Sequence, residues 1–209
     1  MNKPALDLAF PRTWTAEVLE KRPLIAPSRQ YVYPQQVEEV ERGALELLVK
    51  PASGDPFLAT CALGFADPNA PTGVWSCPGP DWLCAVSGGY AYLIHTLQPE
   101  RWSQIPYRPV LGLRALPEQQ LLLFVGHHSI LAWGGDGEAW QTPRLSWEGI
   151  EITDIAGHTL CGLGWDLITD KDVPFAIDLK TGEHTGGTKM SCHPSEPHPG
   201  RLMDKLPQN

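Results

Sequence analysis

The chain has 209 residues, of which 42% are apolar, and its formal net charge is −8. This size and composition predict a folded protein with one main domain, and the negative charge disfavours nucleic acid and anionic membranes as partners. No apolar run approaches the roughly 20 residues that cross a bilayer, and the N-terminus lacks the apolar centre of a signal peptide. Five irregularly spaced cysteines indicate reduced thiols, so we expect a cytoplasmic protein without a membrane partner.

Residues 1–43 are predicted to form an N-terminal arm with little regular structure. Within this arm, Thr15 can cap a short helix over residues 15–21, and a proline lies just beyond that segment. A second short helix is predicted over residues 35–42, because proline precedes it and glycine follows it.

Residues 44–187 are predicted to form an all-β domain of antiparallel meanders. Short runs rich in Ile, Leu, Val, Thr and aromatic residues alternate with turns that contain Gly, Pro or Asp, which is the pattern of strands joined by tight turns. The predicted strands, in chain order, are residues 44–50, 57–65, 82–86, 90–96, 110–116, 120–125, 130–133, 138–142, 150–155, 159–165 and 173–179.

A weak repeat runs through this domain. Residues 92–102 and 130–140 each read as a strand, a polar turn and then a tryptophan, and residues 175–185 repeat the form with threonine in the tryptophan position. The copies lie about 40 residues apart, which is the spacing of blade-type β repeats.

One segment of the last copy, AIDLKTGEH, resembles the strand–turn–strand signature of quinoprotein-type β-propeller blades. The resemblance implies blade-like packing of the meanders, and a β-barrel or a β-sandwich is the alternative architecture. The region from LSWEGI to DLKTGEHTGG is also similar to a group of bacterial hypothetical proteins without an assigned activity, which implies no site residues.

Histidines on or beside predicted strands are the first candidates for chemistry. His127 and His128 follow the most apolar strand, so either could serve as a base or metal ligand, and His95 lies on another predicted strand, where it could serve as a base. Adjacent residues on a strand point to opposite faces, so His127 and His128 cannot easily share one site. The alternative is a hairpin corner with one packed and one solvated imidazole.

Large aromatic residues are the second group of candidates. Trp133, Trp140 and Trp165 could line a ligand pocket, although core packing is the commoner role of tryptophan in a β-rich chain. Asp166 closes a strand directly after Trp165, which makes it the carboxylate most worth following.

His184, Cys192, His193 and His198 offer four nitrogen or sulfur ligands for Zn²⁺, but their spacing matches no standard zinc motif. No phosphate-binding loop, dinucleotide fingerprint or Cys-x-x-Cys pair is present. We therefore predict no metal site and no cofactor.

Two interpretations of function follow. The first is a non-catalytic binding or protein-interaction protein, whose partner is a protein or a small molecule. The second is a small hydrolase or isomerase that uses His95, His127 or His128 as its base. One cleft that joins a histidine to a carboxylate would favour the enzyme, and a flat aromatic surface would favour binding.

Residues 188–209 are predicted to form a polar, proline-rich tail. We expect this tail to dock on the β domain, or on a second subunit of a homodimer, through Met190, Leu202, Met203 and Leu206.

Overall fold

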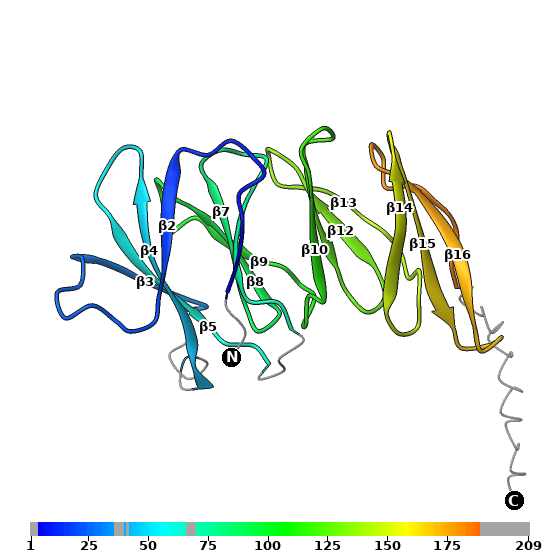
Figure 1. Ribbon diagram of the computed structural model, residues 1–209, viewed down its shortest axis with the longest axis horizontal. Helices are drawn as coiled ribbons and strands as arrows, with labels where there is room; N and C mark the ends of the chain where they lie inside the picture. The colour runs from blue at the N-terminus through cyan, green and yellow to red at the C-terminus, as the bar shows by residue number, and fades with distance from the viewer. Residues whose placement is uncertain (1–3, 36–39, 41, 66–69, 189–209) are drawn as a thin grey trace, which may run out of the picture.

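The computed structural model describes residues 4–35, 40, 42–65 and 70–188. These residues form strands β1 to β17 and contain no α-helix. The strands make up four sheets, which follow one another in a row along the molecule (Figure 1). The prediction of an all-β fold is confirmed, and no sheet closes into a barrel within the described part of the chain.

The first two sheets combine strands from distant parts of the sequence. The first sheet has the order β2 (Trp14–Leu19), β4 (Ala44–Pro51), β5 (Phe57–Ala62) and β3 (Arg29–Tyr33). The second sheet has the order β1 (Ala5–Asp7), β6 (Gly73–Ser76), β7 (Trp82–Ser87), β8 (Tyr90–His95) and β9 (Trp102–Gln104). Two pairs are parallel, β1 with β6 and β3 with β5.

The last two sheets are antiparallel meanders in which each strand pairs with the next. The third sheet consists of β10 (Gly112–Leu116), β11 (Leu121–Val125), β12 (Ile130–Trp133) and β13 (Glu138–Gln141). The fourth sheet consists of β14 (Ile150–Ala156), β15 (Thr159–Asp166), β16 (Lys171–Asp178) and β17 (His184–Gly186). These meanders are blade-like, as the predicted strands and turns indicate.

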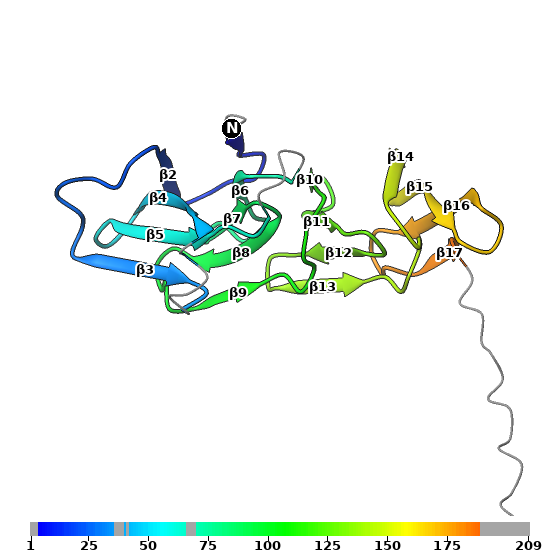
Figure 2. The same cartoon turned by 90° about the horizontal axis from the view of Figure 1, so that it is seen from below.

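Neighbouring sheets stack face to face, and each pair encloses an apolar core (Figure 2). Complete burial of one large apolar side chain stabilises a fold by about 1.5–3 kcal/mol, so this stacking holds the row together. Because the second and third sheets lie between two neighbours, β11 is buried on both faces. Members of the three cores, in order along the row, are Leu47, Phe57 and Tyr92, then Leu93, Phe124 and Leu131, then Ile130, Leu160 and Phe175.

The predicted helix over residues 15–21 is wrong, because this segment forms β2 and pairs with β4. Trp14 is buried in the first core, and Ala16 and Val18 pack against that core, so the period is two rather than 3.6. Pairing and burial therefore override a helix start that looks acceptable locally. The predicted helix over residues 35–42 falls mainly on residues outside those the structure describes.

The weak repeat marks the same hairpin in three sheets, β8–β9, β12–β13 and β16–β17. However, Trp102 packs against the core between the first and second sheets, whereas Trp140 lies in the core between the third and fourth. The two tryptophans therefore face opposite neighbours. A one-residue offset between the copies is enough for this, since successive strand residues point to opposite faces.

The predicted tail begins at Thr188, the last residue that the structure describes. The docking prediction, with Met190, Leu202, Met203 and Leu206, lies outside the described residues, as do Cys192, His193 and His198. A search of the described residues finds no helix with the length and apolar character required to pass through a membrane.

Candidate functional site

His127 and His128 lie in the loop between β11 and β12, which contacts the connection to the fourth sheet. The His128 carbonyl accepts hydrogen bonds from the backbone N–H of Leu145, at 2.7 Å, and of Ser146, at 3.3 Å. Nδ1 of His128 lies 3.2 Å from the Ser146 carbonyl oxygen and 3.3 Å from a guanidinium nitrogen of Arg144. His127 is half-buried and His128 is exposed. This arrangement is that of a hairpin corner.

The structure brings His95 and Trp133 together through Trp82, at one end of the core between the second and third sheets. Trp82 makes edge-to-face contacts with both, with ring centroids 5.1 Å from His95 and 6.0 Å from Trp133. The Arg101 guanidinium lies 5.1 Å from the Trp82 ring centroid, in cation–π contact. His95 Nδ1 and Trp133 Nε1 are buried without a hydrogen-bond partner in the described structure. The cluster thus lacks a carboxylate bonded to its histidine, which a general base commonly uses.

Asp166 joins the end of β15 to the residue that leaves the fourth sheet. Its Oδ1 accepts a 2.6 Å hydrogen bond from the Thr188 hydroxyl, and its Oδ2 accepts bonds from the Thr169 hydroxyl and backbone N–H. These hydrogen bonds, the one from Thr188 first, hold the pKa of Asp166 below its usual range. Asp166 therefore acts as an ionised structural tie at this corner.

Trp140 and Trp165 have different environments. Trp140 is buried in the core between the third and fourth sheets, and its Nε1 donates a 2.9 Å hydrogen bond to the Leu179 carbonyl. Trp165 is only partly buried, on the far side of the fourth sheet, where its Nε1 donates to Asp170 at 3.3 Å. Of the three tryptophans predicted to bind a ligand, Trp165 is thus the one whose ring lies on a sheet face that no other described sheet covers.

No site in the described part of the chain joins a histidine to a carboxylate by a hydrogen bond. An open hollow of about 700 Å³ beside β16 and β17 is lined by Asp178, Glu183 and His184, but His184 bonds to neither carboxylate. A smaller hollow of about 220 Å³ lies between β10 and β14 and is lined by Leu113, Arg114 and Ile152 among others. Within the described residues, no group of three His, Cys, Asp or Glu side chains could hold a metal ion.

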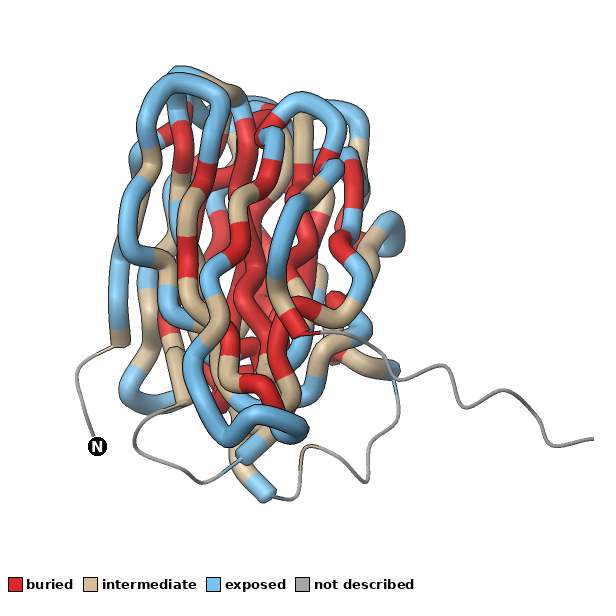
Figure 3. Tube along the Cα trace, turned by 90° about the vertical axis from the view of Figure 1, so that its right-hand side faces the viewer, coloured by how far each residue is buried: buried red, intermediate tan, exposed pale blue. Residues whose placement is uncertain are grey.

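The outer face of the fourth sheet carries a row of apolar side chains. Opposed residues of paired strands share a face, so the strand registers place Cys161, Leu163 and Trp165 of β15 beside Pro174 and Ala176 of β16. All five are at least partly exposed. We call these five residues the apolar row. Figure 3 shows the molecule from the end at which the fourth sheet lies.

Strand β15 directs its larger residues away from the core. Its core side carries Gly162 and Gly164, and a Cβ atom at Gly162 would lie 2.3 Å from Cζ of Phe175. The Phe175 ring therefore occupies the space that a side chain at position 162 would need. Leu163 and Trp165 consequently lie on the outer face, where nothing in the described chain covers them fully.

Carboxylates border the apolar row along β14 and at both ends of its β16 part. Glu151 and Asp154 of β14 lie opposite Leu163 and Cys161, and Asp172 of β16 lies opposite Trp165. Asp178, opposite Thr159, lies at the other end of the β16 part of the row, beyond Ala176. All four carboxylates are exposed, and none forms an ion pair in the part of the chain that the structure describes.

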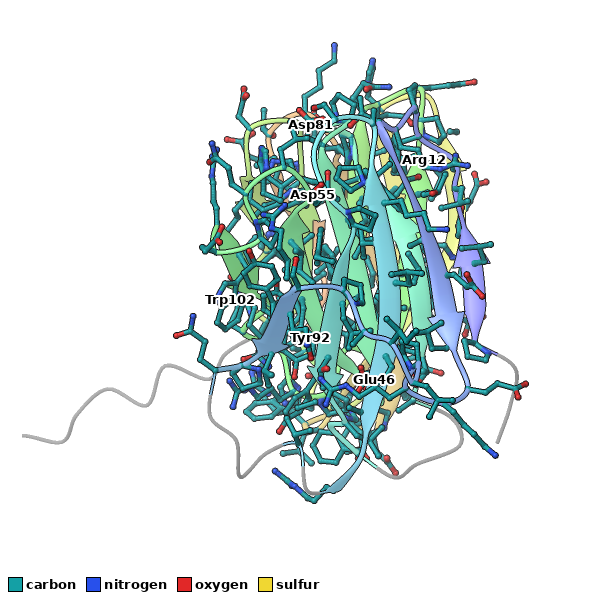
Figure 4. The ribbon with its side chains drawn as sticks, turned by 90° about the vertical axis from the view of Figure 1, so that its left-hand side faces the viewer. Arg12, Glu46, Asp55, Asp81, Tyr92 and Trp102 are labelled. Atoms are coloured by element: carbon teal, nitrogen blue, oxygen red, sulfur yellow. The ribbon has the colours of Figure 1, made fainter. Side chains whose placement is uncertain are left out.

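The opposite end of the row, the first sheet, has a different outer face (Figure 4). On its central strand β5, Leu58 and Thr60 point outward, yet both are buried. The labelled Glu46 accepts a 2.8 Å hydrogen bond from the Thr60 hydroxyl. This face is therefore already covered at its centre, whereas the centre of the outer face of the fourth sheet is partly open.

Among the site residues predicted from the sequence, only Trp165 belongs to the outer face of the fourth sheet, and Cys161 and Leu163 were not predicted to be part of a site. A signal for them exists in the sequence. The run Leu160-Cys161-Gly162-Leu163-Gly164-Trp165 lacks the polar residues that normally alternate along a strand with one solvated face.

No protein-family model matches the chain, and no curated protein sequence matches it. Among solved structures, the chain is similar to the crystal structure of the N-terminal domain of Nup159, with a TM-score of 0.34 and 13% sequence identity. The match covers 88% of this chain and 53% of that one, so the chain spans about half the length of its structural neighbour. A TM-score this low supports no argument about function.

Proposed function

We propose that this protein is a non-catalytic protein-interaction module that binds its partner through the outer face of the fourth sheet. The observation that carries the proposal is the apolar row, which lies at the centre of the outer face of the last sheet, where no other described sheet covers it. Interfaces place apolar and aromatic side chains at their centre and polar groups at the rim. Trp165, Leu163 and the flanking carboxylates have this distribution.

The alternative function, a small hydrolase or isomerase, has less support. His95, His127 and His128 have no carboxylate partner among the described residues, and the cluster around Trp82 is filled by packed rings. The apolar row, with Trp165 as its aromatic member, supports the binding function instead.

The test compares the wild type with Leu163→Ser and with a control, Leu24→Ser. Leu24 is fully exposed in the loop between β2 and β3, in the first-sheet part of the chain. A partner captured by the wild type is identified, purified and titrated by calorimetry against all three proteins. The proposal expects lost binding for Leu163→Ser alone, with unchanged melting temperatures. A partner that binds Leu163→Ser as tightly as the wild type would overturn it.

A further inference from the structure

We infer that the partner segment bound by the outer face of the fourth sheet is an amphipathic helix with basic residues on both flanks. This inference rests on the proposed function and adds the chemistry of the partner. Its starting point is the arrangement of charges around the apolar row, with Glu151 and Asp154 beside it on β14 and with Asp172 and Asp178 at the two ends of its β16 part.

The flanking carboxylates argue against a further stacked sheet on this face. The three cores between sheets are built from apolar side chains, and among the described residues Asp166, at the end of β15, is the one charged side chain that is buried. Another sheet in the same packing would cover Glu151, Asp154 and Asp172, and burying unpaired carboxylates is unfavourable. A narrower segment along β15 would contact the apolar row while the carboxylates stay at its edges, in contact with water.

The dimensions of this face match those of an α-helix. Strands β14 and β16 each lie about 4.8 Å from β15, so the outer side chains of β14 and β16, with the carboxylates among them, are about 10 Å apart, close to the diameter of a helix. Along β15, Cys161, Leu163 and Trp165 are spaced by about 7 Å, and helix residues four apart are spaced by about 6 Å. A helix parallel to β15 could therefore place one apolar side chain near each of the three.

Charge sets the composition of the helix flanks. No Lys or Arg of the described chain forms an ion pair with Glu151, Asp154 or Asp172, so these carboxylates are available to a partner. At one end of the row, Asp178 and Glu183 line the open hollow of about 700 Å³, which offers space for a further cationic side chain. A second copy of this face would instead bring two acidic rims together and is disfavoured.

The probe is a designed helical peptide of about 18 residues with leucines along one face and lysines on both flanks. Its comparison peptide has glutamates in place of the lysines. Calorimetry measures affinity, and the rate of alkylation of Cys161, which is in the apolar row, reports whether the peptide covers this face. The basic peptide is expected to bind and to slow alkylation of Cys161, and the acidic peptide is expected to do neither.

Two triple variants separate charge at the face from total charge. Glu151→Gln/Asp154→Asn/Asp172→Asn, the rim variant, removes three of the four carboxylates around the apolar row, and Glu17→Gln/Glu118→Gln/Asp136→Asn removes three exposed carboxylates elsewhere. Each exposed ion pair contributes a small factor, and three together give about a tenfold loss of affinity. This loss of affinity for the basic peptide is expected in the rim variant and not in the other triple variant. The difference from the wild type should become smaller as the salt concentration rises.

Three results would overturn the inference. The basic peptide could bind the rim variant as tightly as it binds the wild type and yet fail to bind Leu163→Ser. That result would reject a basic partner and leave the proposed function standing. If both peptides bind equally well, or if neither peptide binds, an amphipathic helix with basic flanks is rejected as the partner. A dimer in light scattering that Leu163→Ser dissociates would show that a second copy occupies the face.

Discussion

Replacement of Gly182 by alanine tests how the third and fourth sheets are held together. Gly182 lies in the turn between β16 and β17 with a φ of +75°, and an added Cβ would lie 2.7 Å from Cγ of Trp140. Gly149 is a matched control, because its φ is +76° and an added Cβ would meet nothing within 4 Å. The two substitutions thus share the backbone strain and differ in the contact with Trp140.

The expected magnitudes follow from these two terms. A side chain in the left-handed region costs about 1–2 kcal/mol, which is the full effect expected for Gly149→Ala. Gly182→Ala adds about 1–3 kcal/mol of overpacking, because the added Cβ contacts Cγ of Trp140, and rotation of the indole ring does not move this atom away. The free energies of unfolding should therefore differ by about 1–3 kcal/mol, or about 2–12 °C in Tm for a chain of this length.

The assay is thermal unfolding followed by circular dichroism, with urea unfolding as a second measurement. Gly182→Ala combined with Trp140→Ala offers a further check, since removal of the ring should relieve part of the added penalty, while the Cβ of residue 140, 2.8 Å from the added atom, remains. If Gly182→Ala and Gly149→Ala had equal Tm values, the reasoning about the contact between this turn and Trp140 would be refuted.

Three further predictions concern other contacts. Trp140→Phe should lower the free energy of unfolding by about 1–3 kcal/mol in urea titrations, because a buried carbonyl loses its donor. The pKa of Asp166 is lower in the folded state than its unfolded value of about 3.9, so its stabilising effect is present above that pH and lost as pH falls through the folded pKa. The free energy of unfolding of Asp166→Asn should therefore be lower than that of the wild type at pH 7, and the difference should vanish in acid. In a Cys192→Ser background, Cys161 should react with a thiol reagent in the native protein, whereas burial raises the pKa of Cys84 and should keep it unreactive; equal rates would contradict this.

The positions of many strands could be predicted from the sequence. The runs that became β8, β11, β12, β15 and β16 are apolar, short and bounded by Gly, Pro or Asp turns, and the observed bounds differ from the predicted ones by at most two residues. These features are local, since turn chemistry and side-chain alternation depend on neighbours in the chain. The order of the blade-like hairpins along the chain could be predicted from the sequence for the same reason.

Other features depended on contacts between distant residues. Residues 15–21 have an acceptable helix start, and only pairing with β4 makes them a strand. The parallel pairs β1–β6 and β3–β5 join segments that no local pattern connects. The meeting of His95 and Trp133 through Trp82 likewise results from the stacking of two sheets.

The candidate binding face shows this division within one strand. The sequence by itself determined that residues 160 to 165 would be a strand with apolar residues on both faces. Only the tertiary structure decided which face would be open, because the third sheet covers Leu160 and the glycines while no neighbouring sheet covers Leu163 and Trp165 within the described chain. Exposure is a property of the stack, since each sheet face is buried by residues far away in sequence.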